Sequence, residues 1–93
     1  MGGRAAVVVA DKLAAAARGR QVLCVTHLAP IAARAARHLR VAKSVRAGRT
    51  RVSATALGGD DRVAEVARML GGDATSEALQ HARKLLGRYN GPA

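Results

Sequence analysis

The sequence predicts an α/β chain in which a few-stranded sheet is flanked by helices. Apolar residues recur at helical spacing in three segments, 4–18, 62–70 and 77–86, and short β-branched runs lie between the first two. The chain has 93 residues, a length that fits one small domain or part of one.

The N-terminal half predicts a helix, a strand and a second helix. Ala6, Leu13 and their neighbours place one apolar stripe on a helix over Arg4 to Arg18. The continuous apolar run Gln21 to Val25 is short and β-branched, which favours a buried strand. No other strand of the chain is as apolar, so the sheet that this strand needs is expected elsewhere. A helix follows over Ala29 to Arg37.

A hairpin and a capped helix are expected next. Leu39 to Val45 and Arg51 to Leu57 favour two strands, and residues 47–50 between them, which include a glycine, favour a tight turn. Asp60 or Asp61 is expected to cap the helix that follows, since a carboxylate can accept bonds from the first free N–H groups.

The last two helices are expected to bury small aliphatic stripes. Gly71 and Gly72 should end the first helix, and residues 75–77 should open the second. There is no Trp or Phe, so the core must be Ala, Val and Leu, which predicts marginal stability or a missing partner surface. The stripes are Val63, Val66, Ala67 and Leu70, then Leu79, Ala82, Leu85 and Leu86.

The basic charge lies in the middle of the chain. The net charge is +10, and no acidic residue occurs between Lys12 and Gly59. Such a field attracts polyanions, although the Ala- and Arg-rich composition of a GC-rich genome explains the excess equally well. Candidate phosphate or DNA contacts are Arg34, Arg37, Arg40, Lys43, Arg46, Arg49 and Arg51.

Thr26 and His27 directly follow the expected strand, where α/β sheets place ligand-binding residues. An imidazole there can donate a hydrogen bond to a phosphate or position a water. Cys24 is expected to be a buried small hydrophobe. His38 and His81 are expected on the surface, and the histidines with Cys24 lack metal-ligand spacing, so no metal site is predicted.

No apolar run reaches the roughly 18–20 residues that a membrane span needs, and residues 1–10 do not form a secretory signal. The single cysteine suits a reducing compartment, so the expected location is the cytoplasm, with no membrane partner.

The segment Gln21 to Leu28, QVLCVTHL, resembles the last core strand and switch histidine of the ATPase head in the RecN family of bacterial DNA-repair proteins. The similarity continues through residues 39–43 and 48–50 and is strongest at 62–72, RVAEVARMLGG. Residues 2–6 are similar to the tail of the family's D-loop and the start of its next helix. The resemblance therefore covers nearly the whole chain.

The resemblance implies the C-terminal fragment of an SMC-like, ABC-type P-loop ATPase head, whose full-length form uses ATP and Mg²⁺. It implies as partners the N-terminal part of the head, a second head in a dimer, and DNA at double-strand breaks, with a nucleoid location. His27 maps to the switch histidine, which contacts the γ-phosphate and the attacking water. Gly2 and Gly3 map to the end of the D-loop, which communicates across the head dimer. Residues 1–88 would form the head portion and 89–93 a frayed tail.

This sequence departs from the family pattern in what it lacks. The P-loop, the signature motif and the acidic Walker B strand lie N-terminal to this piece in the family. Phosphoryl transfer needs these parts together, so the chain is expected to bind no ATP and no cofactor alone, and whether it is an enzyme stays open. Ala29-Pro30 also stands where the family tends to have Pro then Gln, and helix 32–37 is more basic. The alternatives are a small basic module that binds nucleic acid without specificity, and an inert remnant.

Overall fold

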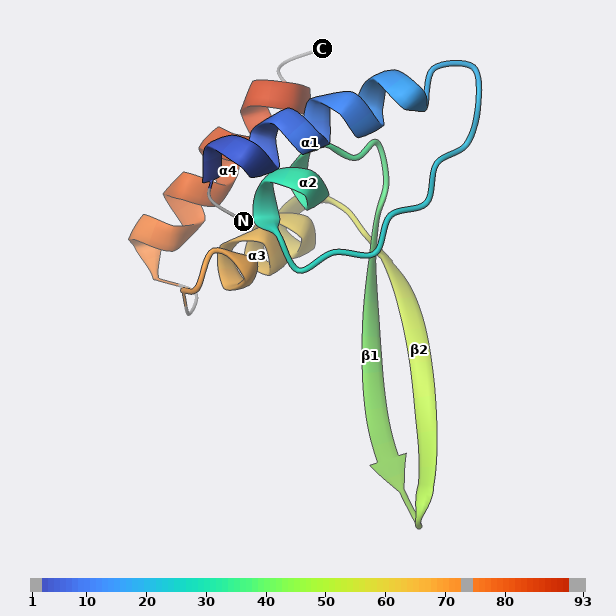
Figure 1. Ribbon diagram of the computed structural model, residues 1–93. Coiled ribbons are helices and arrows are strands. Elements are labelled where there is room, and N and C mark those ends of the chain that lie inside the picture. Colours follow the sequence, from blue (N-terminus) through green and yellow to red (C-terminus); the bar gives the residue numbers. More distant parts are fainter. Residues whose placement is uncertain (1–2, 73–74, 91–93) are drawn as a thin grey trace.

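The computed structural model describes residues 3–72 and 75–90, which form helices and one antiparallel hairpin. Figure 1 shows the helices gathered at one end and the hairpin projecting away from them. This mixture of helices with a two-stranded sheet confirms the predicted α/β class. The elements are α1 (Gly3–Ala16), α2 (Ala29–Arg34), β1 (His38–Arg46), β2 (Arg49–Leu57), α3 (Gly59–Met69) and α4 (Ser76–Asn90).

The core lies where α2, α3 and α4 meet. The apolar stripes predicted for the last two helices face this point, with Val66 and Ala82 fully buried. Most of the buried side chains in the described part of the chain are alanines, which confirms the prediction of a core without large groups. The cluster comprises Ala29, Ala33, Val66, Ala67, Ala82 and Leu86, with partly buried Val63, Met69, Leu70, Ala78, Leu79 and Leu85 around it.

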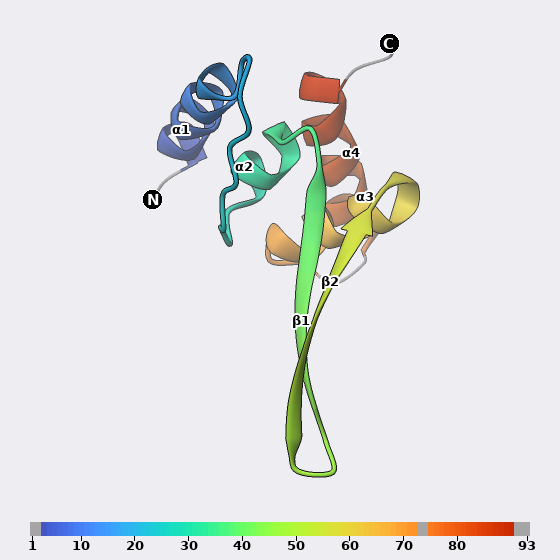
Figure 2. The same cartoon turned by 90° about the vertical axis from the view of Figure 1, so that its right-hand side faces the viewer.

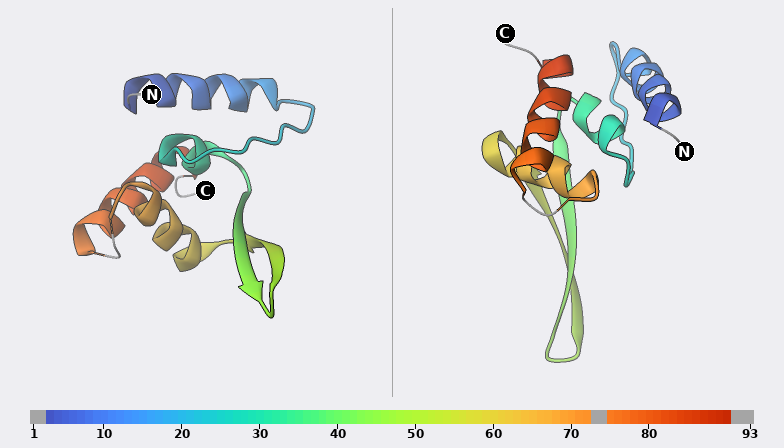
Figure 3. Two further views of the ribbon diagram at one scale, coloured as in Figure 1. Left: turned by 60° about the horizontal axis from the view of Figure 1, so that its bottom comes forward. Right: turned by 90° about the vertical axis from the view of Figure 1, so that its left-hand side faces the viewer.

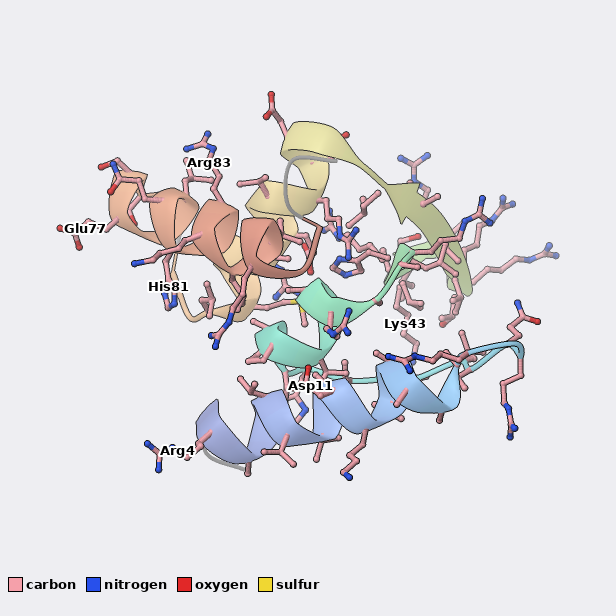
Figure 4. All side chains as sticks on the ribbon, turned by 90° about the horizontal axis from the view of Figure 1, so that it is seen from above. Arg4, Asp11, Lys43, Glu77, His81 and Arg83 are labelled. Atoms are coloured by element: carbon pink, nitrogen blue, oxygen red, sulfur yellow. The ribbon has the colours of Figure 1, made fainter. Side chains whose placement is uncertain are left out.

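Helix α1 packs on α2 from the side opposite the core, so that α2 lies between α1 and the α3–α4 pair (Figure 2). Ala6 and Ala10 are the residues that α1 buries, as its stripe predicted. Asp11 lies on the side of α1 that faces α2 (Figure 4), and its Oδ1 accepts a bond from Arg34 Nε at 3.3 Å. Helix α2 ends at Arg34, three residues earlier than the sequence predicted.

The hairpin has nine residues in each strand and a two-residue turn. Ala47 and Gly48 both take positive φ, 52° and 74°, as a type I′ turn requires. This turn follows the right-handed twist of the strands, which keeps the pairing regular from His38 opposite Leu57 to Arg46 opposite Arg49. The predicted hairpin is confirmed, with each strand longer than predicted.

The hairpin contributes no side chain to the buried core of the described residues. At about 3.3 Å per residue its strands extend about 30 Å. Both views of Figure 3 show it standing clear of the helices. The radius of gyration is 14.2 Å, whereas a compact domain of this length would have about 12 Å, and the projecting hairpin explains the difference.

The helix ends follow the predicted glycines but not the predicted acidic cap. The cap of α3 is Gly58, with no side-chain bond, while Asp60 and Asp61 lie inside the first turn. At these positions their negative charges still interact favourably with the positive end of the helix dipole. Gly71 ends the turn after α3 at φ 91°, and a Cβ on Gly72 would come within 2.7 Å of the Cβ of Ala78. Helix α4 opens as predicted, with Thr75 Oγ1 accepting a bond from the Ala78 N–H at 3.2 Å.

The predicted buried strand at residues 21–25 does not form. This segment has no strand partner in the described chain and crosses from α1 to α2 without regular structure. Leu23 is 84% exposed and Val25 is 95% exposed, and Cys24 is exposed rather than buried. The prediction was wrong because an inner strand needs hydrogen-bonded neighbours on both sides, and the strands of the described residues pair only with each other.

Within the described ranges, no helix is both long enough and apolar enough to cross a membrane. Helix α4 runs on to Asn90.

Replacing Val66 with alanine should destabilise the chain by about 1.5–3 kcal/mol, because it removes buried methyl groups from a core that cannot collapse around the loss. Val66 is 0% exposed. Val8→Ala on α1 is the matched control, since Val8 is 54% exposed and should change stability by less than about 0.5 kcal/mol. Urea unfolding followed by circular dichroism measures both, and equal losses would contradict this location of the core.

Candidate functional site

His27 lies in a bend between the unpaired segment 21–25 and α2, with its side chain exposed. The bend is held by Thr26, whose Oγ1 accepts a bond from the Leu28 N–H at 3.0 Å. This bond turns the backbone immediately around His27, and among the described residues the imidazole has no hydrogen-bond partner. Both imidazole nitrogens are therefore accessible to a ligand.

The apolar residues that precede His27 in the sequence are exposed to solvent. Val22, Leu23 and Val25 precede it and are all exposed. Large aliphatic side chains exposed in a row mark a surface that another part of a protein covers. Segment 21–25 therefore presents an uncovered apolar surface directly before His27.

The hairpin also carries an uncovered apolar face. Residues directly opposite one another in an antiparallel pair share a face, so Leu39, Val41 and Val45 lie on the same side as Val52. These four side chains are 51–68% exposed. Two-stranded hairpins are marginal in water, and this face would be stabilised by packing against another surface.

The candidate basic residues divide between different surroundings. Arg34 pairs with Asp11, and Arg40 approaches a carboxylate of α3. Lys43 lies on the apolar face of the hairpin, opposite Val52. The exposed Arg37 lies between α2 and β1. The remaining three, Arg46, Arg49 and Arg51, share the polar face near the hairpin tip.

A polar cluster that the sequence did not predict joins the base of the hairpin to the helices. Arg62, in the first half of α3, reaches the C-terminal end of α2. Its Nη2 donates to the carbonyl oxygens of Ala32 at 3.1 Å, Ala33 at 3.5 Å and Ala35 at 2.6 Å. The last carbonyls of a helix lack partners within the helix, so this guanidinium completes the end of α2. Partial burial lowers the pKa of Arg62.

Glu65 is the acidic centre of the cluster and is buried to 8% exposure. It accepts bonds from Arg68, whose Nε lies 3.0 Å and 3.1 Å from its two oxygens, and from the Nη2 of the same side chain. Arg40 Nε of β1 lies 3.7 Å from Oε2. The hydrogen bond from Arg68 is the main cause that lowers the pKa of Glu65, with burial opposing it and the charges of Arg68, Arg40 and His38 adding to it.

His38 opens β1 beside this cluster and is half-buried, so the prediction that it lies on the surface was wrong. Its Nδ1 is buried without a hydrogen-bond partner among the described residues. Burial lowers the pKa of His38, the Arg62 charge lowers it further, and Glu65 opposes both. The exposed His81 is confirmed as a surface residue, and it points outward from α4 in Figure 4 together with Arg83.

The contact between Arg62 and α2 spans about thirty positions of sequence, so no local pattern could reveal it. The only available signal was the pair Glu65 and Arg68 at i and i+3, which helical geometry brings together. Of the two glycines assigned to the D-loop, Gly3 begins α1 and Gly2 lies outside the described residues. Across the described ranges no three His, Cys, Asp or Glu side chains gather as metal ligands.

Arg62→Met should lower the free energy of unfolding by about 1.5–3 kcal/mol, because it leaves the α2 carbonyls of a half-buried site without a charged donor. Arg83→Met on the outer side of α4 is the control with the same loss of charge and should have little effect. Urea titrations of both variants measure the change in the free energy of unfolding. No change for Arg62→Met would show that water replaces the guanidinium.

Lowering the pH should reduce the free energy of unfolding over the range in which Glu65 becomes protonated. Its folded pKa is lowered, so its contribution is present above the unfolded value of about 4.5 and is lost as pH falls through the folded value. Glu65→Gln should destabilise the chain at pH 7 by about 1–2 kcal/mol and flatten the loss of stability below about pH 4.5. Unfolding midpoints between pH 3 and pH 7 test this, with Glu77→Gln as the exposed control.

Comparison with known proteins identifies the segment that this chain matches. The chain is 54% identical over 86 residues to the DNA repair protein RecN of Deinococcus radiodurans, 47% identical over 87 residues to that of Treponema pallidum, and 41% identical over 85 residues to that of Bacillus subtilis. These matches cover 90–92% of this chain but only 15% of each relative. No family model matches the chain. Over nearly its whole length the chain is therefore similar to the C-terminal part of these RecN proteins, and it spans about a seventh of their length.

Proposed function

We propose that this chain acts in DNA repair as the C-terminal piece of an SMC-like, ABC-type ATPase head, and that His27 is its switch residue. The observation that carries the proposal is the similarity to several RecN proteins along nearly the whole chain. The relatives are DNA repair proteins by name, and this chain spans about a seventh of their length. The rest of such a head would supply the surfaces that this chain lacks.

The exposed apolar surfaces support the proposal that a larger head receives this piece. Segment 21–25 has the composition of an inner strand but no partner, and the hairpin presents four aliphatic side chains to solvent. Both features are explained if the N-terminal part of the head adds strands beside 21–25. The paired strand would end at Thr26 and place His27 at the carboxyl end of the sheet, where α/β proteins bind ligands.

His27 suits the role of a γ-phosphate contact because its imidazole is exposed and has no protein partner among the described residues. In its neutral form it can donate one hydrogen bond to a phosphate oxygen and accept one from a water. The chain itself offers no glycine-rich phosphate loop beside His27. Mg²⁺ and ATP would be held by the other part of the head, so the chain alone is expected to hydrolyse nothing.

Complementation tests this proposal. The Deinococcus radiodurans relative, truncated before the matched segment, is mixed with this chain, and ATP hydrolysis is measured against each part alone. We expect activity only in the mixture. His27→Ala should reduce the turnover rate by about 10²-fold or more, because the attacking water loses its positioning group.

His81→Ala is the matched control, since His81 is an exposed histidine on α4. It should leave hydrolysis by the mixture unchanged. Loss of activity in both variants would contradict a switch role for His27. A mixture in which the two parts bind each other without hydrolysing ATP would contradict a competent split head, and parts that do not bind would favour an inert remnant.

A further inference from the structure

The polar face of the hairpin gathers three arginines near its tip. Arg46 of β1 lies directly opposite Arg49 of β2, and Arg51 lies opposite Ser44, two pairs further from the turn. Directly opposed residues share a face, and residues two apart on a strand return to it. The three guanidinium groups therefore project from one side of the ribbon, which we name the arginine tip, comprising Arg46, Arg49 and Arg51.

The arginine tip has no neutralising partner. The salt bridges of the described residues involve Arg34, Arg40 and Arg68, and none involves the tip. No acidic residue lies anywhere between positions 12 and 59. Like charges directly across a hairpin are destabilising, so the Arg46–Arg49 pair opposes the pairing of its own strands. An anion bound between the guanidinium groups would remove that repulsion.

A shallow, open depression lies among the side chains of the tip. A concavity of about 810 Å³ is lined by Ser44, Arg46, Ala47, Arg49 and Arg51. Its lining consists of the tip arginines, one hydroxyl and one methyl group, with no carboxylate. Guanidinium groups bind phosphate oxygens through paired N–H donors, so the hollow presents several such forks at once.

We propose that the arginine tip binds the phosphate backbone of duplex DNA without reading its sequence. A two-stranded ribbon fits the major groove of B-DNA, which is about 12 Å wide, and the tip stands about 30 Å from the start of the strands. The tip carries no aromatic side chain on which an unpaired base could stack, which favours a duplex over a single strand. The choice of DNA as the polyanion rests on the proposed repair function.

The two faces of the hairpin then have separate roles. The aliphatic face, with Leu39, Val41, Val45 and Val52, is covered by the remainder of the head, while the arginine tip stays in solvent. The other candidate basic residues are not equivalent to the tip, because Arg34 and Arg40 already approach carboxylates and Lys43 projects from the aliphatic face. The DNA contact is thus assigned to three of the seven candidates.

Fluorescence anisotropy with a labelled 30-base-pair duplex of random sequence tests the proposal on this chain alone, without ATP and without any other part of a head. Three variants are compared with the unmodified chain over a salt series from 50 to 250 mM. The first is R46Q/R49Q/R51Q, the second is R46K/R49K/R51K, and the third is the charge-matched control R18Q/R20Q/R83Q, which removes exposed arginines elsewhere.

We expect the glutamine tip variant to weaken binding at least tenfold at 100 mM salt and to reduce the slope of log K against log salt by about 2–3, because three phosphate contacts are lost. The lysine variant should keep most of the slope, which also shows that the tip tolerates substitution without loss of the hairpin. The control should change the slope by less than about 1, as long-range charge alone would.

Equal weakening by the control and the glutamine tip variant would overturn the proposal, since net charge would then explain binding. So would the absence of duplex binding by the unmodified chain at 100 mM salt, or a preference for a single-stranded 30-mer. Sedimentation with vesicles that contain phosphatidylglycerol is the third arm, and tip-dependent binding to vesicles without binding to DNA would assign the tip to a membrane surface. Failure of ATPase complementation leaves this readout intact, because DNA binding is measured on the chain alone.

Discussion

The arrangement of this chain depends on one guanidinium group. Arg62 reaches from α3 to the free carbonyls at the end of α2, and the neighbouring Glu65 holds Arg40 at the start of the hairpin. A six-residue helix has too few internal bonds to be stable alone, so α2 exists because Arg62 and the core hold it from one side and α1 from the other. Without this cluster the hairpin would have no fixed direction relative to the helices.

Buried and exposed apolar side chains lie in different parts of the chain. The buried side chains where α2, α3 and α4 meet are mostly alanines, with Ile31, Val66 and Leu86 among them, whereas the aliphatic groups of segment 21–25 and of the hairpin face solvent. Covering these exposed groups with a further surface would stabilise the chain in proportion to the area buried. The chain spans 15% of the length of its relatives.

Local patterns predicted the elements well and their surroundings poorly. Helical stripes and turn glycines gave α1, α3, α4 and the hairpin close to their observed limits, because spacing and φ preferences act within a few residues. The predictions that Cys24 is buried and that residues 21–25 form a strand were wrong, since both need neighbouring strands that the described residues do not supply. The site was predictable in part: His27 came from its place after an apolar run, whereas Arg62 acts on carbonyls distant in sequence.

The unpaired strand edges of the hairpin favour self-association of the chain at high concentration. Each of its two strands has only one neighbour, so both outer edges offer free N–H and C=O groups to any other strand. Edges of this kind, beside an aliphatic face, are templates for stacking one molecule on the next. Positive charge at the tip keeps such copies apart in dilute salt, and counterions remove that protection.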